Sequence, residues 1–141
     1  MTADASQPAA IRRAALCLWL SAAFALLAMT VQVLGWVPLV GSTPGMTAII
    51  GLATAGLLAV VAISIGARHG WVRWLFAVIY VIGTLGAMVL VVIAPEAFRG
   101  IPTVLQANVV AQFILQTAAL ILMFTSSSRH WFATRRAENA P

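Results

Sequence analysis

Three amide side chains recur along one segment, "TVLQANVVAQFILQTAAL" at residues 103–120, which is otherwise apolar enough to lie in hydrocarbon. Asn108, Gln112 and Gln116 are spaced by four residues, so at about 100° per residue they fall within about 80° of a helix circumference and form one polar stripe. An amide donates and accepts hydrogen bonds and carries no charge. The chemistry that this amide stripe offers is therefore hydrogen bonding, and the stripe is expected to face away from lipid.

Three interpretations of what the amide stripe faces stay open. Its amides can bond to Thr84 and Tyr80 of the preceding apolar segment, or to Gln32 of the first, each contact contributing on the order of 0.6 kcal/mol and up to about 2 kcal/mol. The stripe can instead meet a transmembrane helix of a partner protein, or line a pocket for a lipid or small polar solute. We take bonding within the chain as the default. A fourth amide, Gln106, is expected at the membrane surface.

Other chemistry is largely excluded by the ionisable residues and their places. The three acidic residues, Asp4, Glu96 and Glu138, are all predicted in tails or loops, which argues against a proton-coupled pump because such proteins place an ionisable group at membrane depth. His69 and His130 each stand beside an arginine, and no Cys/His/Asp spacing completes a metal site. No nucleophile or phosphate-binding motif occurs. We expect no enzymatic activity, no metal and no other cofactor.

The elements that position the amides are apolar runs. The 141 residues are 62 % hydrophobic and 8 % charged, with a mean hydropathy of +1.03, whereas soluble domains are about 45–50 % apolar and about 25 % charged. About 20 apolar residues suffice to span the hydrocarbon as a helix. Four such runs predict an all-α membrane protein, a compact antiparallel bundle in one domain over 1–141 with polar tails at 1–11 and 126–141, and with helices at about 14–36, 46–67, 71–93 and 105–125.

Arginine sets the expected orientation, because the chain contains no lysine and its arginines are unevenly placed. Only Arg99 falls on one side of the predicted bundle. By the positive-inside rule the other side, with both termini and the "RHG" turn, is cytoplasmic. The net charge of +5 therefore needs no nucleic-acid partner. The arginines expected to contact cytoplasmic headgroups are Arg12, Arg13, Arg68, Arg73, Arg129, Arg135 and Arg136.

Small residues mark a second face, on the second predicted helix. Gly51, Ala55, Ala59 and Ala62 are spaced by four, four and three residues, a pattern that lets another helix approach closely. The third helix carries Tyr80, Gly83 or Thr84, and Ala87 at similar spacing. We interpret these small-residue stripes as packing faces, turned to each other or to a neighbouring helix of the bundle.

As a whole, the chain resembles small four-span bacterial inner-membrane proteins that have cytoplasmic ends and no assigned activity. The ending "ILMFTSSSRHWF", in which the last span runs into a serine-rich turn, arginine and a Trp-Phe pair, is the most similar part. Two further families have the same size and topology: the four-span carriers of glycosyl lipids and the small multidrug exporters. The exporters depend on a glutamate in their first helix, and the first helix of this chain contains no acidic residue.

The sequence therefore favours a non-catalytic accessory or interaction subunit of the membrane. Its expected partners are the lipid bilayer and, beyond that, a membrane protein or further copies of this chain. The alternative interpretation is a small transporter or lipid carrier that uses the amide stripe.

Overall fold

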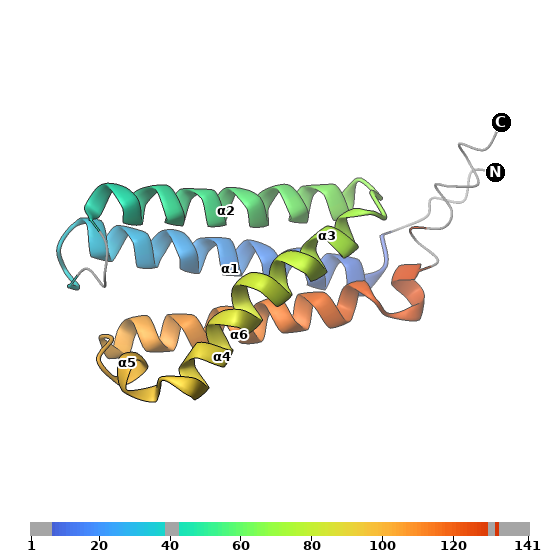
Figure 1. Cartoon of the computed structure of the whole chain (residues 1–141). Helices are drawn as coiled ribbons and strands as arrows, with labels where there is room; N and C mark the ends of the chain where they lie inside the picture. The colour runs from blue at the N-terminus through green and yellow to red at the C-terminus, as the bar shows by residue number, and fades with distance from the viewer. Residues whose placement is uncertain (1–6, 39–42, 130–131, 133–141) are drawn as a thin grey trace, which may run out of the picture.

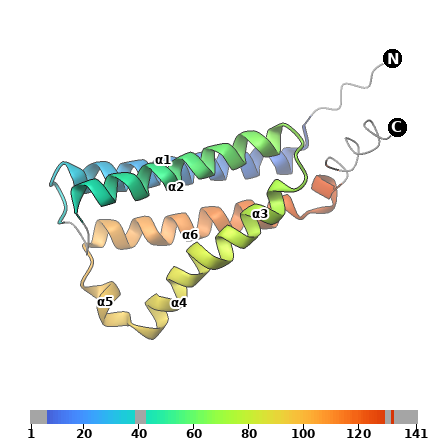
Figure 2. The same ribbon diagram turned by 45° about the horizontal axis from the view of Figure 1, so that its top comes forward.

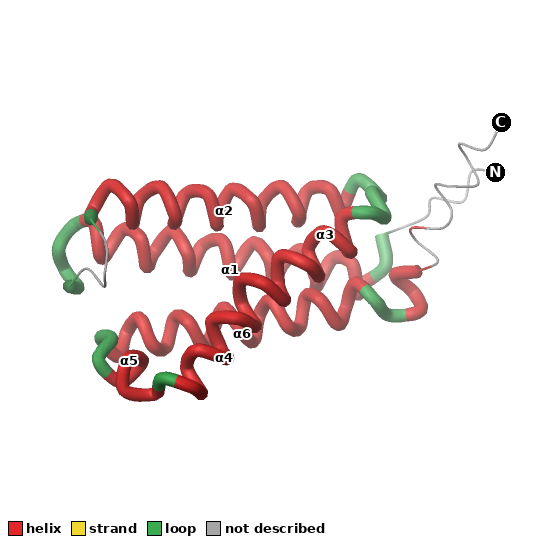
Figure 3. The backbone as a smooth tube through the Cα atoms, viewed as in Figure 1, coloured by secondary structure: helices red, strands yellow, loops and turns green. Residues whose placement is uncertain are grey.

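The computed structural model describes residues 7–38, 43–129 and Phe132, and in this part of the chain the regular structure is helical, with no strand (Figures 1 and 3). Four helices are long and apolar enough to cross a membrane, which confirms the predicted all-α class. We call the third of these, Val72–Ile93, the third span, since three helical segments continue one another in it. The elements are α1 (Ala9–Val33), α2 (Pro44–Gly66), α3 (Val72–Ile79), the π-helix η1 (Tyr80–Leu85), α4 (Gly86–Ile93), α5 (Pro95–Arg99) and α6 (Thr103–Met123).

Helix boundaries differ from the predicted ones mainly in α1 and α5. Helix α1 begins at Ala9 rather than near residue 14, because helical hydrogen bonding continues through Arg12, whose backbone N–H donates to the Pro8 carbonyl at 3.1 Å. It ends at Val33, before Gly35, whose φ of 74° leads the chain out of the helix. The short α5 was not predicted. Hydropathy detects the apolar core of a span and gives no signal for helix in the polar surface region.

The two ends of α2 are fixed by local chemistry. The Thr43 hydroxyl accepts a hydrogen bond from the Met46 backbone N–H at 3.3 Å, and Pro44 occupies the first helical turn, where its missing N–H costs nothing. At the other end Arg68 adopts a φ of 61°, and the His69 N–H donates back to the Ser64 carbonyl at 3.1 Å. This closure turns the chain sharply from α2 into α3 at the short "RHG" connection.

Helices α1 and α2 make the most extensive contact of the structure, and α1 then packs on α6. The small residues of α2 lie against α1: Ala55 and Ala62 are buried, and Gly51 lies so close to Met29 that a β-carbon added to the glycine would be 2.6 Å from the Met29 β-carbon. Small side chains let two helix backbones approach in this way. The α2 stripe is thus a packing face between neighbouring helices of one chain.

The buried core is concentrated at one end of the bundle. We call this the basic end; it holds the start of α1, the end of α2, the start of α3 and the end of α6, together with Arg12, Arg13, Arg68, Arg73 and Arg129 (Figure 1). The opposite end, with α5 and Arg99, is the far end. The largest apolar side chains that are at most 3 % exposed all lie in the basic half: Ile11, Leu18, Leu58, Val61, Ile65, Val72, Phe76 and Met123.

The third span leans away from α2 as it approaches the far end (Figure 2). Helix α3 packs on α2 and α6, and η1 packs on α6, whereas within the described residues the extensive contacts of α4 are only with η1 and α5. Side chains on this part of the span are correspondingly open, with Ile82 75 %, Val92 80 % and Ile93 72 % exposed. The bundle is therefore closed at the basic end and splayed at the far end.

The contact of Gly51 with Met29 gives a test of the α1–α2 interface. Gly51→Ala places a methyl group against the Met29 side chain near its base, which forces the helices apart, and we expect a destabilisation of about 1–3 kcal/mol. Gly56→Ala is the matched control, because a β-carbon there meets nothing within 4 Å. Thermal unfolding in mild detergent should show a lower Tm for the first variant only. Equal Tm values for the two variants would contradict this packing.

Candidate functional site

Polar side chains gather near the middle of all four spans. Ser21 is the central residue of α1 (Ala9–Val33), and Thr54 is next to the centre of α2; the third span contributes Thr84, and α6 contributes Gln112 and Gln116 on either side of its centre. Since a helix rises about 1.5 Å per residue, these side chains lie within a few ångströms of the middle of their helices, which corresponds to the bilayer centre for helices that span a membrane. Polar groups at this depth must find hydrogen-bond partners inside the protein or on a ligand.

Gln116 joins three of the four spans. It is 6 % exposed, and its amide oxygen accepts a hydrogen bond from the Thr84 hydroxyl of the third span. Its amide nitrogen donates to the Ser21 hydroxyl of α1 at 3.0 Å, and Ser21 is fully buried. Without these bonds each group would be an unpaired polar atom in an apolar interior, which is energetically costly. This set of bonds therefore fixes where α1, α6 and the third span meet.

A second connection holds the third span to α6. The Tyr80 and Thr117 hydroxyl oxygens are 2.7 Å apart, and the Thr117 hydroxyl donates to the Phe113 carbonyl at 2.6 Å, so Tyr80 is the donor to Thr117. The Tyr80 ring also stacks on the Phe113 ring, with centroids 6.4 Å apart and planes inclined by 26°. Both Tyr80 and Thr84 belong to the π-helix η1, a rare helical form that occurs often at functional sites.

We call the bonded residues Ser21, Tyr80, Thr84, Gln116 and Thr117 the polar cluster. Beyond this polar cluster a cleft opens between α2 and the third span, with α6 at its base. We call it the α2–α4 cleft; its volume is about 460 Å³. It is closed toward the basic end by Leu58 and Phe76, which are 3 % and 1 % exposed. Its polar lining consists of Thr54, Thr84, Gln112 and Gln116, and its other lining residues are Ile50, Leu57, Leu58, Phe76, Ile79, Gly83, Ala87, Met88 and Val109.

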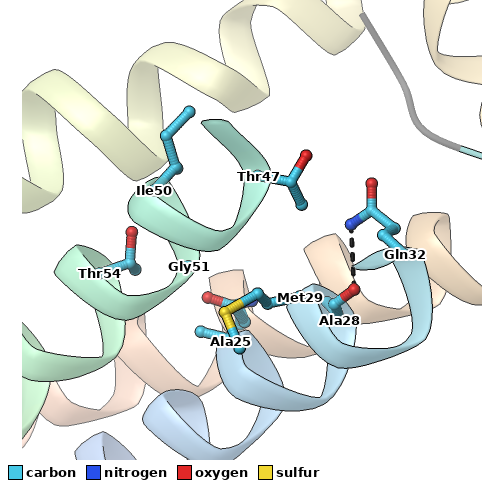
Figure 4. Close-up of a pocket in the computed structure, with 9 residues that line it drawn as sticks. Ala25, Ala28, Met29, Gln32, Thr47, Ile50, Gly51 and Thr54 are labelled. Carbon is cyan, nitrogen blue, oxygen red and sulfur yellow. Dashed lines mark hydrogen bonds between the residues drawn. The ribbon is translucent and has the colours of Figure 1, made fainter. Parts of the chain in front are cut away.

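A second hollow of about 330 Å³ adjoins the cleft where α1, α2 and α6 meet, and we call it the α1–α2 groove (Figure 4). The two share Ile50, Thr54 and Gln112 as lining residues. Gln32 and Thr47 extend the polar lining toward the far end. The Gln32 amide nitrogen donates to the Ala28 carbonyl of its own helix at 3.0 Å, so it does not bond to the amide stripe.

Two polar groups on the cleft wall have unused hydrogen-bonding capacity. Gln112 accepts one long bond, at 3.5 Å, from the Gln116 amide nitrogen. In the described part of the chain, neither the Gln112 amide nitrogen nor the Thr54 hydroxyl has a partner of its own. Both side chains are partly exposed and line the cleft. The site is therefore an uncharged, amphipathic cleft with a donor and a hydroxyl available near the middle of α2 and α6.

The predicted amide stripe is divided between different surroundings. Gln116 is buried in the polar cluster and Gln112 lines the α2–α4 cleft, whereas Asn108 lines a separate, mostly apolar hollow of about 300 Å³ between α1 and α6. Thr84 is bonded to Gln116, while Tyr80 is bonded to Thr117 rather than to an amide. All three amides are at least partly buried.

Three residues of the site were not identified from the sequence: Ser21, Thr54 and Thr117. Hydroxyl residues are common in apolar helices, where each can bond to its own backbone, so composition gives no reason to select them. The position of Ser21 and Thr54 at the centres of their spans is the one signal that singles them out.

The predicted headgroup-contacting arginines that the structure describes all lie at the basic end, and Arg135 and Arg136 fall outside the described residues. Arg73 is packed among aromatic rings, with its Cζ 5.5 Å from the Phe132 centroid, 5.6 Å from Phe124 and 5.9 Å from Trp74. Such contacts stabilise a cation at a membrane interface. This arrangement belongs to the basic end, and Arg73 is not among the residues that line the cleft.

No group of three or more His, Cys, Asp or Glu side chains that could hold a metal ion occurs among residues 7–38, 43–129 and Phe132. No protein-family model, no curated protein and no solved structure matches this chain.

The hydrogen bonds of Gln116 predict which of two variants is less stable. Gln116→Leu removes the bonds to Ser21 and Thr84 and leaves both hydroxyls without this partner, so we expect a destabilisation of about 1–3 kcal/mol. Gln112→Leu loses only one long bond and should destabilise the protein less. Unfolding monitored in detergent by tryptophan fluorescence measures both. A larger effect for Gln112→Leu would overturn the assignment of Gln116 as the central residue.

Proposed function

We propose that this chain is a non-catalytic interaction protein of the bacterial cytoplasmic membrane, and that it acts by binding another component of the bilayer in the α2–α4 cleft. The observation that carries the proposal is the unequal packing of the two halves of the bundle. The basic half has a tight apolar core, whereas the far half is splayed and has a hollow of about 460 Å³ beside the polar cluster. A volume of 300–1,000 Å³ is typical of ligand sites, as a rough guide.

The residues that line the cleft support a binding role over a catalytic one. They are amides, hydroxyls and apolar side chains, and none of them is ionisable. General acid–base catalysis needs a titratable group within hydrogen-bond reach of the reacting atoms. Hydrogen-bond recognition needs only correctly placed donors and acceptors, which Thr54 and Gln112 supply.

A second candidate function, lipid carriage, is favoured by the series of polar residues that leads inward from the far end. Gln32 and Thr47 lie toward the far end, and Thr54, Gln112 and Gln116 follow nearer the bilayer centre. Transfer across the membrane would also require passage through the closed basic half. Binding requires no such change, so the interaction role is the simpler of the two.

The orientation that we propose has both chain ends and the α2–α3 turn in the cytoplasm. Its support is the uneven distribution of arginine: among the described residues, five lie at the basic end and Arg99 alone at the far end. In this orientation the α2–α4 cleft opens in the half of the membrane away from the cytoplasm.

Photocrosslinking tests the proposed binding. A photoreactive amino acid is placed at Ile50, which lines the cleft, or at Ile49, which is 70 % exposed at the same depth but lines neither hollow. We expect a discrete lipid or protein adduct at position 50 and only diffuse labelling by bulk lipid at position 49. The same diffuse labelling at both positions would show that the cleft holds no particular component.

Cysteine labelling tests the proposed orientation. In a Cys17→Ser background, Glu96→Cys places a thiol at the far end and Ser127→Cys places one at the basic end, and both positions are exposed. An impermeant maleimide added to intact spheroplasts should label the cysteine at position 96 and not that at 127 until the membrane is opened. The reverse pattern would invert the topology.

A further inference from the structure

We infer that the ligand of the α2–α4 cleft is a lipid with an uncharged, hydroxyl-bearing headgroup, which enters from the far half and places its headgroup between Thr54 and Gln112. This inference rests on the proposed function and specifies the class of molecule that the cleft takes. Four observations lead to it: the size of the cleft, its lack of charge, its unused hydrogen-bonding groups and its one-sided opening.

The size of the cleft suits a slender ligand better than a transmembrane helix. A transmembrane helix is about 10 Å wide and continuous across the bilayer, whereas the cleft lies beside only part of the third span and is closed at one end by Leu58 and Phe76. Its volume of about 460 Å³ lies within the range of about 300–1,000 Å³ that is typical of small-ligand sites.

The absence of charged side chains in the cleft excludes an anionic headgroup. No arginine, histidine or acidic side chain is among its lining residues or those of the α1–α2 groove. A phosphate moved to this depth would have no counter-charge, and burying an unpaired charge is far more costly than burying an unpaired hydroxyl. The described arginines that suit phosphate lie at the basic end, with Arg99 at the surface of the far end.

The unused hydrogen-bonding groups match hydroxyls. The Gln112 amide nitrogen offers a donor, and the Thr54 hydroxyl both donates and accepts. A headgroup hydroxyl also donates and accepts, so it satisfies either group. A partner's helix backbone does not, because its N–H and C=O groups are already bonded to each other.

The entrance is defined by the third span. Beyond η1, α4 has no extensive contact with α2 among the described residues. The third span also presents Gly83 and Ala87 to the cleft, and their small side chains leave space between the two helices. At the other end Leu58 and Phe76 close it. A lipid can therefore enter sideways from the far half with its chain remaining in the bilayer.

Native mass spectrometry of the protein in phosphatidylcholine nanodiscs tests the inference with two matched probes. Monooleoylglycerol and oleoyl lysophosphatidic acid carry the same chain on the same glycerol and differ in the phosphate. We expect the neutral lipid to be retained at one molecule per chain and to be preferred by about tenfold or more, equivalent to about 1.4 kcal/mol. Thr54→Val together with Gln112→Leu should abolish retention, and Asn108→Leu, which removes an amide outside the cleft, should leave it unchanged.

Each outcome has a distinct meaning. Retention of the lysophospholipid equal to or above that of the neutral lipid overturns the uncharged class and leaves the proposed function standing. A retained protein or a second copy of the chain, in place of lipid, overturns the lipid assignment alone. No retained component, together with no discrete adduct at position 50, overturns both. If the double variant unfolds, Thr54→Val alone, which keeps the side-chain shape, must still weaken retention; unchanged retention overturns the inference.

Discussion

The structure depends on one buried amide, that of Gln116, which must be hydrogen bonded because it is only 6 % exposed inside an apolar helix bundle. Its partners, Ser21 and Thr84, are on two other spans, so a single side chain ties α1, α6 and the third span together at mid-depth. The Tyr80–Thr117 bond reinforces the same junction. Between helices in lipid there is no hydrophobic driving force, and packing and hydrogen bonds decide which helices stay together.

This junction also separates two differently packed halves. On its basic side, large apolar residues such as Leu18, Phe76 and Met123 are almost fully buried. On its far side α4 has no comparable packing on α1, α2 or α6 in the described part of the chain. The cleft results from this difference in packing, because the third span packs on α6 as far as η1 and diverges beyond it.

Much of this architecture is predictable from the sequence because the bilayer imposes it. The length of the apolar runs predicts the four spans, and the spacing of Asn108, Gln112 and Gln116 predicts a polar face on the last of them. The small residues at Gly51 and Ala55 predict a close helix contact. In each case a single physical rule connects residue type to position.

The rest of the architecture cannot be predicted from the sequence, and the reason is again physical. Lipid is as apolar as a protein core, so hydropathy does not distinguish Phe76, which is 1 % exposed, from Ile82, which is 75 % exposed. The divergence of the third span, and with it the cleft, therefore has no sequence signal. Asn108 and Gln112 share a helix face, yet they line different hollows because the neighbouring helices differ.

The most direct test of the central claim, a bundle closed at one end and open at the other, is a pair of spin-label distances measured in nanodiscs. Labels at Ile49 and Val89 report the α2 to α4 separation in the far half, and labels at Ile63 and Leu75 report α2 to α3 in the basic half; all four positions are exposed. The structure predicts a longer distance for the far pair than for the basic pair. Equal distances for the two pairs would mean that the spans run side by side along their whole length, and the cleft would not exist.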